Sequence, residues 1–202
     1  MSISLARRLL DEAASTADRV RRHLLVAAAL QAAYPHRVVV VGGTAEDYWA
    51  NDQYTPTDLD VTGDALPELL VKLGFRRDTD RRHWYHAPSD VVVEFPVERL
   101  AGDWDRIVEI PLGQGSAWVI SLEDLYLDRL SQSTAQEVGW ADGREFKAAL
   151  AIAAARADQM DWGYVRRLIR ESALRSQLET RHRAVRRRIR QAVTSPEHSV
   201  SE

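Results

Sequence analysis

The chain has 202 residues, of which 45% are hydrophobic and 28% charged, and its formal net charge is −3. A chain of this length can bury a sizeable core without crosslinks, so we expect one domain, with or without a small helical appendage. The absence of cysteine excludes disulfides, thiolate zinc sites, iron–sulfur clusters and a cysteine nucleophile. No apolar run reaches the roughly 20 residues of a membrane span, so a cytoplasmic protein with no membrane partner is expected.

The N-terminal third predicts a helix, a buried strand and a second helix. Apolar residues recur every three or four positions over about 4–34, which is typical of one amphipathic helix. Four consecutive valines at 38–41 predict a strand buried on both faces, and Gly42-Gly43 ends it. A short helix is then expected over 44–50, with Thr44 as its N-cap.

The following residues predict further strands and then helices. Short β-branched or aromatic runs bounded by turn residues predict strands at 58–62, 83–86, 91–95 and 117–120. A helix is expected over 66–73, and a hairpin turn at 87–90. Helices are expected from Ser121 to about 130, from 142 or 143 onward, and from Asp161 to Ser195-Pro196, where a frayed tail begins.

These elements predict an α+β fold in which a mixed sheet is flanked by helices. Residues 1–35 would form an N-terminal helix that packs on the core. Residues 36–120 would form the α/β core, and 121–202 a helical C-terminal region that ends in an arginine-rich helix. Ten arginines and five acidic residues lie in 161–202, so the last part of the chain is basic.

A glycine pair follows the first predicted strand. Gly42 and Gly43 allow the backbone to turn tightly and to approach a ligand closely, and Thr44 would expose amide groups at a helix start. Such a turn suits the phosphates of a nucleotide. The alternative is an ordinary turn with no ligand.

Two aspartates lie two positions apart on the second predicted strand. Side chains at that spacing point to the same face, so Asp58 and Asp60 would converge while Leu59 packs into the core. Like charges this close repel each other, and a divalent cation is the simplest way to offset the cost. The alternative is a polar loop.

Glu94 interrupts the valine-rich strand at 91–95. If that strand lies beside the aspartate strand, Glu94 becomes the third carboxylate of a site for two Mg²⁺ ions, which can clamp the attacking and leaving oxygens of a nucleotidyl transfer. Asp90 is the competing third acid, but it falls in the predicted turn.

The order of these motifs resembles a known family. Gly42-Gly43-Thr44, then Asp58-Leu59-Asp60, then Glu94 is similar to the nucleotidyltransferase fold of the DNA polymerase β superfamily. It is most similar to the minimal nucleotidyltransferases of bacterial toxin–antitoxin and abortive-infection systems. The helix expected from Ser121 also matches, so the resemblance covers about residues 38–155.

The resemblance implies a Mg²⁺-dependent enzyme. Such an enzyme moves a nucleotide from a nucleoside triphosphate to a hydroxyl on RNA, tRNA for example, or on protein, and it releases pyrophosphate. It also implies a possible toxin with an antitoxin partner. Asp58, Asp60 and Glu94 would be the catalytic metal ligands. The nucleotide would contact Gly42, Gly43, Thr44, Arg129 and Lys147.

One departure from the family supports an alternative. Two acids that follow the family's lysine are replaced by alanines after Lys147. The chain is therefore interpreted either as an enzyme or as a catalytically weak module that binds a nucleotide or a partner.

Three further segments also carry two interpretations. Arg181–Arg190 is a solvated helix face or an RNA-binding arm. Trp84-Tyr85-His86 is an ordinary hairpin face or a surface that stacks on a base. His83 and His86 have the spacing of a metal pair but no further ligands nearby in the sequence.

Overall fold

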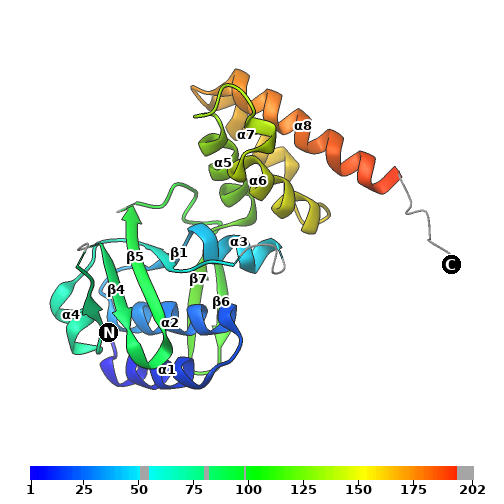
Figure 1. Ribbon diagram of the computed structural model, residues 1–202. Helices are drawn as coiled ribbons and strands as arrows, with labels where there is room; N and C mark the ends of the chain where they lie inside the picture. The colour runs from blue at the N-terminus through cyan, green and yellow to red at the C-terminus, as the bar shows by residue number, and fades with distance from the viewer. Residues whose placement is uncertain (51–54, 80–81, 98, 195–202) are drawn as a thin grey trace, which may run out of the picture. The chain divides into compact units, whose positions relative to one another are not determined.

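The computed structural model describes residues 1–50, 55–79, 82–97 and 99–194. The chain divides into two compact units, Met1–Ser121 and Leu122–Glu202 (Figure 1). The stop expected at Ser195-Pro196 and the frayed tail lie outside the described residues. Among the described residues, no helix combines the length and the apolar character needed to cross a membrane.

The first unit is built on a mixed sheet. In the described part of the chain the sheet has seven strands in the order β3-β4-β5-β2-β1-β7-β6. The strands are β1 (Val39–Val40), β2 (Leu59–Thr62), β3 (Arg76–Arg77), β4 (His83–His86), β5 (Val91–Val97), β6 (Val108–Leu112) and β7 (Gly115–Val119). The pairs β2–β5 and β1–β7 are parallel, and the other neighbours are antiparallel. The α+β class predicted from the sequence is therefore confirmed, with helices around a mixed sheet.

The N-terminal part forms two helices, so the single helix expected over 4–34 is wrong. Helix α1 covers Ile3–Ser15 and α2 covers Arg19–Ala33. Thr16 is extended, and the Asp18 carboxylate accepts a hydrogen bond of 2.6 Å from the Arg21 amide, which caps a new helix. A cap within a continuous apolar pattern thus divides the helix. Helix α2 packs against α1 and β7, and its central residues are fully buried.

The central hairpin forms as predicted, while two edge strands were not expected. Strands β4 and β5 are joined by the short 3-10 helix Ala87–Ser89, at the predicted turn. The missed strands β3 and β6 lie at the two edges of the sheet. Pro111 of β6 is tolerated there because an edge strand need not donate every backbone hydrogen bond.

Two further helices complete the first unit, α3 (Gly42–Ala50) and α4 (Pro67–Lys72). Helix α3 begins at Gly42, so the prediction that Thr44 is its N-cap is wrong. Thr44 lies inside the first turn of the helix and is fully buried.

The second unit is helical throughout. It contains α5 (Leu122–Ser133), the short 3-10 helix Trp140–Asp142, α6 (Arg144–Ala155), α7 (Trp162–Glu171) and α8 (Arg175–Thr194). Asp161 caps α7 as expected, since its carboxylate accepts hydrogen bonds of 3.0 Å from the Gly163 and Tyr164 amides. The single helix expected from Asp161 onward is wrong, because the extended backbone at Ser172 ends α7 before α8 begins.

Candidate functional site

Three side chains from neighbouring strands meet in the first unit. Asp58 precedes β2, His83 begins β4 and Glu94 lies in the middle of β5. The register places His83 opposite Glu94 in the antiparallel pair, while Asp60 pairs with Glu94 in the parallel one. One possible ligand atom from each of Asp58, His83 and Glu94 lies within 4.8 Å of the other two. The strand order therefore brings together residues that are up to 36 positions apart.

Glu94 has separate partners for its two oxygens. His83 Nε2 lies 3.3 Å from Glu94 Oε2 and 3.9 Å from Asp58 Oδ2. The Arg82 guanidinium binds the other oxygen, Glu94 Oε1. Glu94 is only 9% exposed, and a carboxylate this buried requires charged or hydrogen-bonding partners. Arg82, just before β4, and His83, at its start, supply them.

The glycine turn lies against the strand that carries Asp60. Gly42 has a φ of +59°, and a Cβ added there would overlap the Asp60 carboxylate. The Val41 amide donates a hydrogen bond of 3.0 Å to the Asp60 carbonyl, which fixes the turn to the strand. Glycine is therefore required at position 42 by the backbone conformation and by the close approach of Asp60. The role of Asp60 as a metal ligand stays a prediction.

Thr44 braces the segment before β2 from inside the protein. Its hydroxyl donates to the Asp58 carbonyl at 3.2 Å, and His23 Nδ1 of α2 lies 2.8 Å from the Thr44 hydroxyl oxygen. A hydroxyl has one hydrogen, so if Thr44 donates to Asp58, His23 donates to Thr44. Burial, and then the nearby Arg19 and Arg22, lowers the pKa of His23 to about 4, so its ring is neutral at pH 7. The Thr44 hydroxyl is thus engaged with protein atoms.

The remaining residues predicted to contact the nucleotide belong to the second unit. Arg129 is buried on α5, where Nη1 lies 3.0 Å from Gln132 Oε1 and near carboxylates of Asp128 and Glu145. Lys147 lies exposed on α6. Their contact with a nucleotide stays a prediction.

Asp90 and His86, the two alternative ligands suggested by the sequence, lie away from the cluster. Asp90 lies in the exposed hairpin turn with a φ of 52°, and it accepts a hydrogen bond of 3.0 Å from the Tyr85 hydroxyl. It is not part of the three-residue cluster. His86 is buried, with Nδ1 2.8 Å from the Ser89 hydroxyl, so it does not join His83 at a shared site.

Sequence reasoning missed five residues of the first unit, which are His83, Arg82, His23, Arg19 and Asp47. His83 was considered only as the partner of His86, although the predicted turn at 87–90 already implies that position 83 faces 94. Arg82 directly precedes it. The sequence carries no comparable signal for His23 or for the salt bridge of 2.9 Å between Arg19 and the buried Asp47, because both depend on where α2 lies.

The donor atoms of the cluster fit a divalent cation, and the imidazole nitrogen bears on which metal it is. Asp58 and Glu94 offer carboxylate oxygens, which Mg²⁺ and Mn²⁺ prefer. His83 offers an imidazole nitrogen, which suits Mn²⁺ or Zn²⁺ better than Mg²⁺. Two carboxylates and one imidazole therefore fit a cation, and the nitrogen distinguishes the group from the three carboxylates expected.

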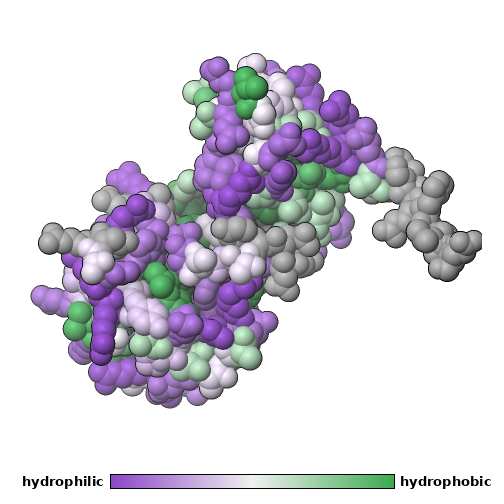
Figure 2. Space-filling view, viewed as in Figure 1, coloured by the Kyte–Doolittle hydropathy of each residue, from purple (hydrophilic) through white to green (hydrophobic). Residues whose placement is uncertain are grey.

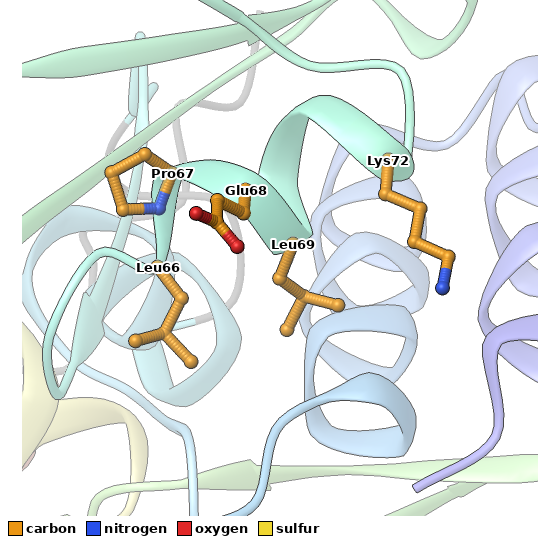
Figure 3. Close-up of a pocket in the computed structure, with 5 residues that line it drawn as sticks. All are labelled: Leu66, Pro67, Glu68, Leu69 and Lys72. Carbon is orange, nitrogen blue, oxygen red and sulfur yellow. The ribbon is translucent and has the colours of Figure 1, made fainter.

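A separate pocket of about 590 Å³ lies along α4 (Figure 3). The described residues that line it are Leu66, Pro67, Glu68, Leu69 and Lys72. Leucine and proline side chains make the lining largely apolar, with one acid and one base. Neither Asp58 nor Glu94 borders it, so it is distinct from the cluster.

Comparison with known proteins finds distant structural likeness only. No protein family matches the sequence, and no curated protein matches it. The chain is similar to the solved structure of an antigenic nucleotidyltransferase-like protein from Paracoccidioides brasiliensis. The TM-score is 0.47 at 11% identity, with 89% of this chain and 94% of that chain covered.

Proposed function

We propose that the first unit is a metal-dependent nucleotidyltransferase that moves a nucleotide from a nucleoside triphosphate to a hydroxyl acceptor on RNA. The observation that carries the proposal is the meeting of Asp58, just before β2, and Glu94, on the neighbouring strand β5, from distant parts of the sequence. The motif order and its resemblance to the polymerase β superfamily support the same function. A role as a toxin with an antitoxin partner is part of this proposal, on the resemblance alone.

In this function the chain's residues hold and orient the substrates. Asp58 and Glu94, with Asp60 beside them, would hold a divalent cation, which when bound neutralises charge on the triphosphate. Gly42 makes room for the Asp60 carboxylate at the start of α3, and the amides of that helix start would favour a phosphate. Glu94 would accept the proton of the attacking hydroxyl through the oxygen that now faces His83. Positioning and charge neutralisation would then provide most of the rate enhancement.

The test is transfer of label from nucleoside triphosphates to total tRNA. The full chain is incubated with each triphosphate labelled at the α-phosphate, with Mg²⁺ or Mn²⁺, and the RNA is separated on a gel. Label on RNA that is lost in Asp58→Ala supports the proposal. Asp90→Asn is the matched control, because it removes an exposed carboxylate from the turn between β4 and β5, outside the cluster. Asparagine also tolerates the positive φ of this position. No transfer with any triphosphate or cation refutes it.

A second candidate is a module that binds a nucleotide or a partner without turnover. Arg82 and His83 already engage both oxygens of Glu94, which favours this candidate. The alanines that replace acids after Lys147 favour it as well. Triphosphate binding measured by calorimetry, together with no label transfer, would identify such a module.

A further inference from the structure

The arginine-rich helix α8 divides its basic side chains into two groups. Arg181, Arg186 and Arg188 lie over aromatic rings of the second unit, with guanidinium carbons 4.2–5.0 Å from the ring centroids. Arg181 also donates hydrogen bonds of 3.2 and 2.9 Å to the carbonyls of residues 133 and 136. These arginines hold the helical unit together. Arg183 and Arg187 are exposed instead, and hydrophilic side chains cover the visible side of α8 (Figure 2).

A basic cavity of about 230 Å³ lies between α7 and α8. The described residues that line it are Arg166, Ile169, Arg170, Glu179, His182 and Arg183. Glu179 Oε1 already pairs with Arg175 Nε at 2.7 Å, one helical turn away. None of the three lining arginines forms an ion pair with another residue in the part of the chain that the structure describes. The cavity therefore has three arginines in its lining, and the Glu179 carboxylate beside them already pairs with Arg175.

The part of the cavity wall formed by His182 is held in place and uncharged at pH 7. His182 Nδ1 lies 2.9 Å from the Tyr126 hydroxyl, and the Trp162 ring lies 5.6 Å from the imidazole. Burial, and then Arg186 and Arg166, lowers the pKa of His182 to about 4. Ile169 is 2% exposed and supplies an apolar surface beside the arginines. Guanidinium groups that converge on a preformed concave surface match the geometry of a phosphate group.

We propose that the cavity between α7 and α8 binds a phosphate group of an RNA strand. An RNA strand is favoured over a free phosphate because exposed arginines continue beyond the cavity. Arg187 follows Arg183 at the four-residue spacing that places both on one helix face, one turn of about 5.4 Å apart. Successive phosphates of one strand can therefore meet successive arginines. The site lies outside the proposed catalytic centre, and the proposal holds whether or not nucleotide transfer occurs.

The test is the binding of a fluorescently labelled oligoribonucleotide to the full chain, measured by anisotropy over a range of salt concentrations. EDTA is present, so that no cation can link the RNA to the carboxylate cluster. We expect Arg166→Gln/Arg183→Gln to weaken binding by about tenfold or more. The slope of log affinity against log salt should fall in magnitude by about 0.7, which is the contribution of one single-strand phosphate, because both arginines line the cavity that holds it.

The matched control is Arg76→Gln/Arg99→Gln, which removes the same charge from exposed arginines of the first unit. All three proteins are first compared by thermal unfolding. Equal weakening in the two double variants would refute the proposal, because only net charge would then matter. Failure of the unaltered chain to bind RNA would also refute it. So would competition by inorganic phosphate at concentrations as low as those of the RNA, because the cavity would then be a free-phosphate site.

Discussion

Replacing Gly42 by alanine tests whether the glycine turn and the aspartate strand are fitted to each other. Gly42 has a φ of +59°, which costs a residue with a side chain about 1–3 kcal/mol. The new Cβ would also overlap the Asp60 carboxylate, and overpacking of this kind costs about 1–3 kcal/mol more. We therefore expect Gly42→Ala to lower the free energy of unfolding by about 2–6 kcal/mol.

Gly113→Ala separates the two contributions. Gly113 belongs to the same unit and has a φ of +67°, but a Cβ there would meet nothing within 4 Å. It should therefore show the backbone cost alone, and the two variants should differ by about 1–3 kcal/mol. For a chain of this size that difference corresponds to roughly 2–12 °C in Tm, which scanning calorimetry resolves.

A second substitution identifies the source of the difference. If the overlap with Asp60 is the cause, Gly42→Ala should cost less in an Asp60→Ala background, because the carboxylate is then absent. Label transfer and cation binding should fall in Gly42→Ala and stay unchanged in Gly113→Ala. Equal melting temperatures for the two glycine variants would show that Asp60 does not restrict the turn.

Three further predictions concern the residues around the cluster. Thr44→Val should lower the free energy of unfolding by about 1–3 kcal/mol in urea unfolding, because it leaves His23 without its buried partner. The control Thr57→Val, at an exposed position, should cost under about 0.5 kcal/mol. The pKa of His23 is about 4 in the folded chain, so as the pH falls the unfolded chain binds the proton first. The free energy of unfolding should therefore fall by roughly 3 kcal/mol as the pH drops from 6.5 to 4. His23→Phe should flatten this pH dependence. His83→Asn should weaken Zn²⁺ binding by about tenfold or more and leave Mg²⁺ binding unchanged in calorimetry, and equal loss of both metals would contradict a nitrogen ligand.

The parts of the fold that could be predicted are those that local sequence encodes. The valine run at 38–41 and the turn at 87–90 produce the central strands and the hairpin where expected. The break at Thr16 could not be read from the apolar pattern, because that pattern continues through it. Strand β3 is two exposed arginines whose pairing with β4 follows only from the sheet.

The site also contains residues that the sequence predicts and residues that only the fold reveals. Asp58 and Glu94 could be named because acids within buried β-branched runs are costly and need a reason. The turn at 87–90 implies that His83 faces Glu94. The meeting of His83 with Asp58 depends on β2 lying beside β5, which local propensity does not encode. His23 looks like any polar residue of a helix until α2 packs over the start of α3 and brings it to Thr44.

The two candidate functions differ in the role of Arg82. Its side chain is 70% exposed, and an ion pair with so exposed a partner is worth at most about 1 kcal/mol. A divalent cation held by Glu94 and Asp58 would displace it readily, and Arg82→Gln should then tighten cation binding. If Arg82 is instead the permanent partner of Glu94, the same substitution leaves a buried carboxylate without its strongest counter-charge, and the chain should lose stability with no gain in cation affinity. Calorimetric titration of Mn²⁺ into the two proteins, beside their melting temperatures, therefore distinguishes a catalytic metal site from a closed ion pair.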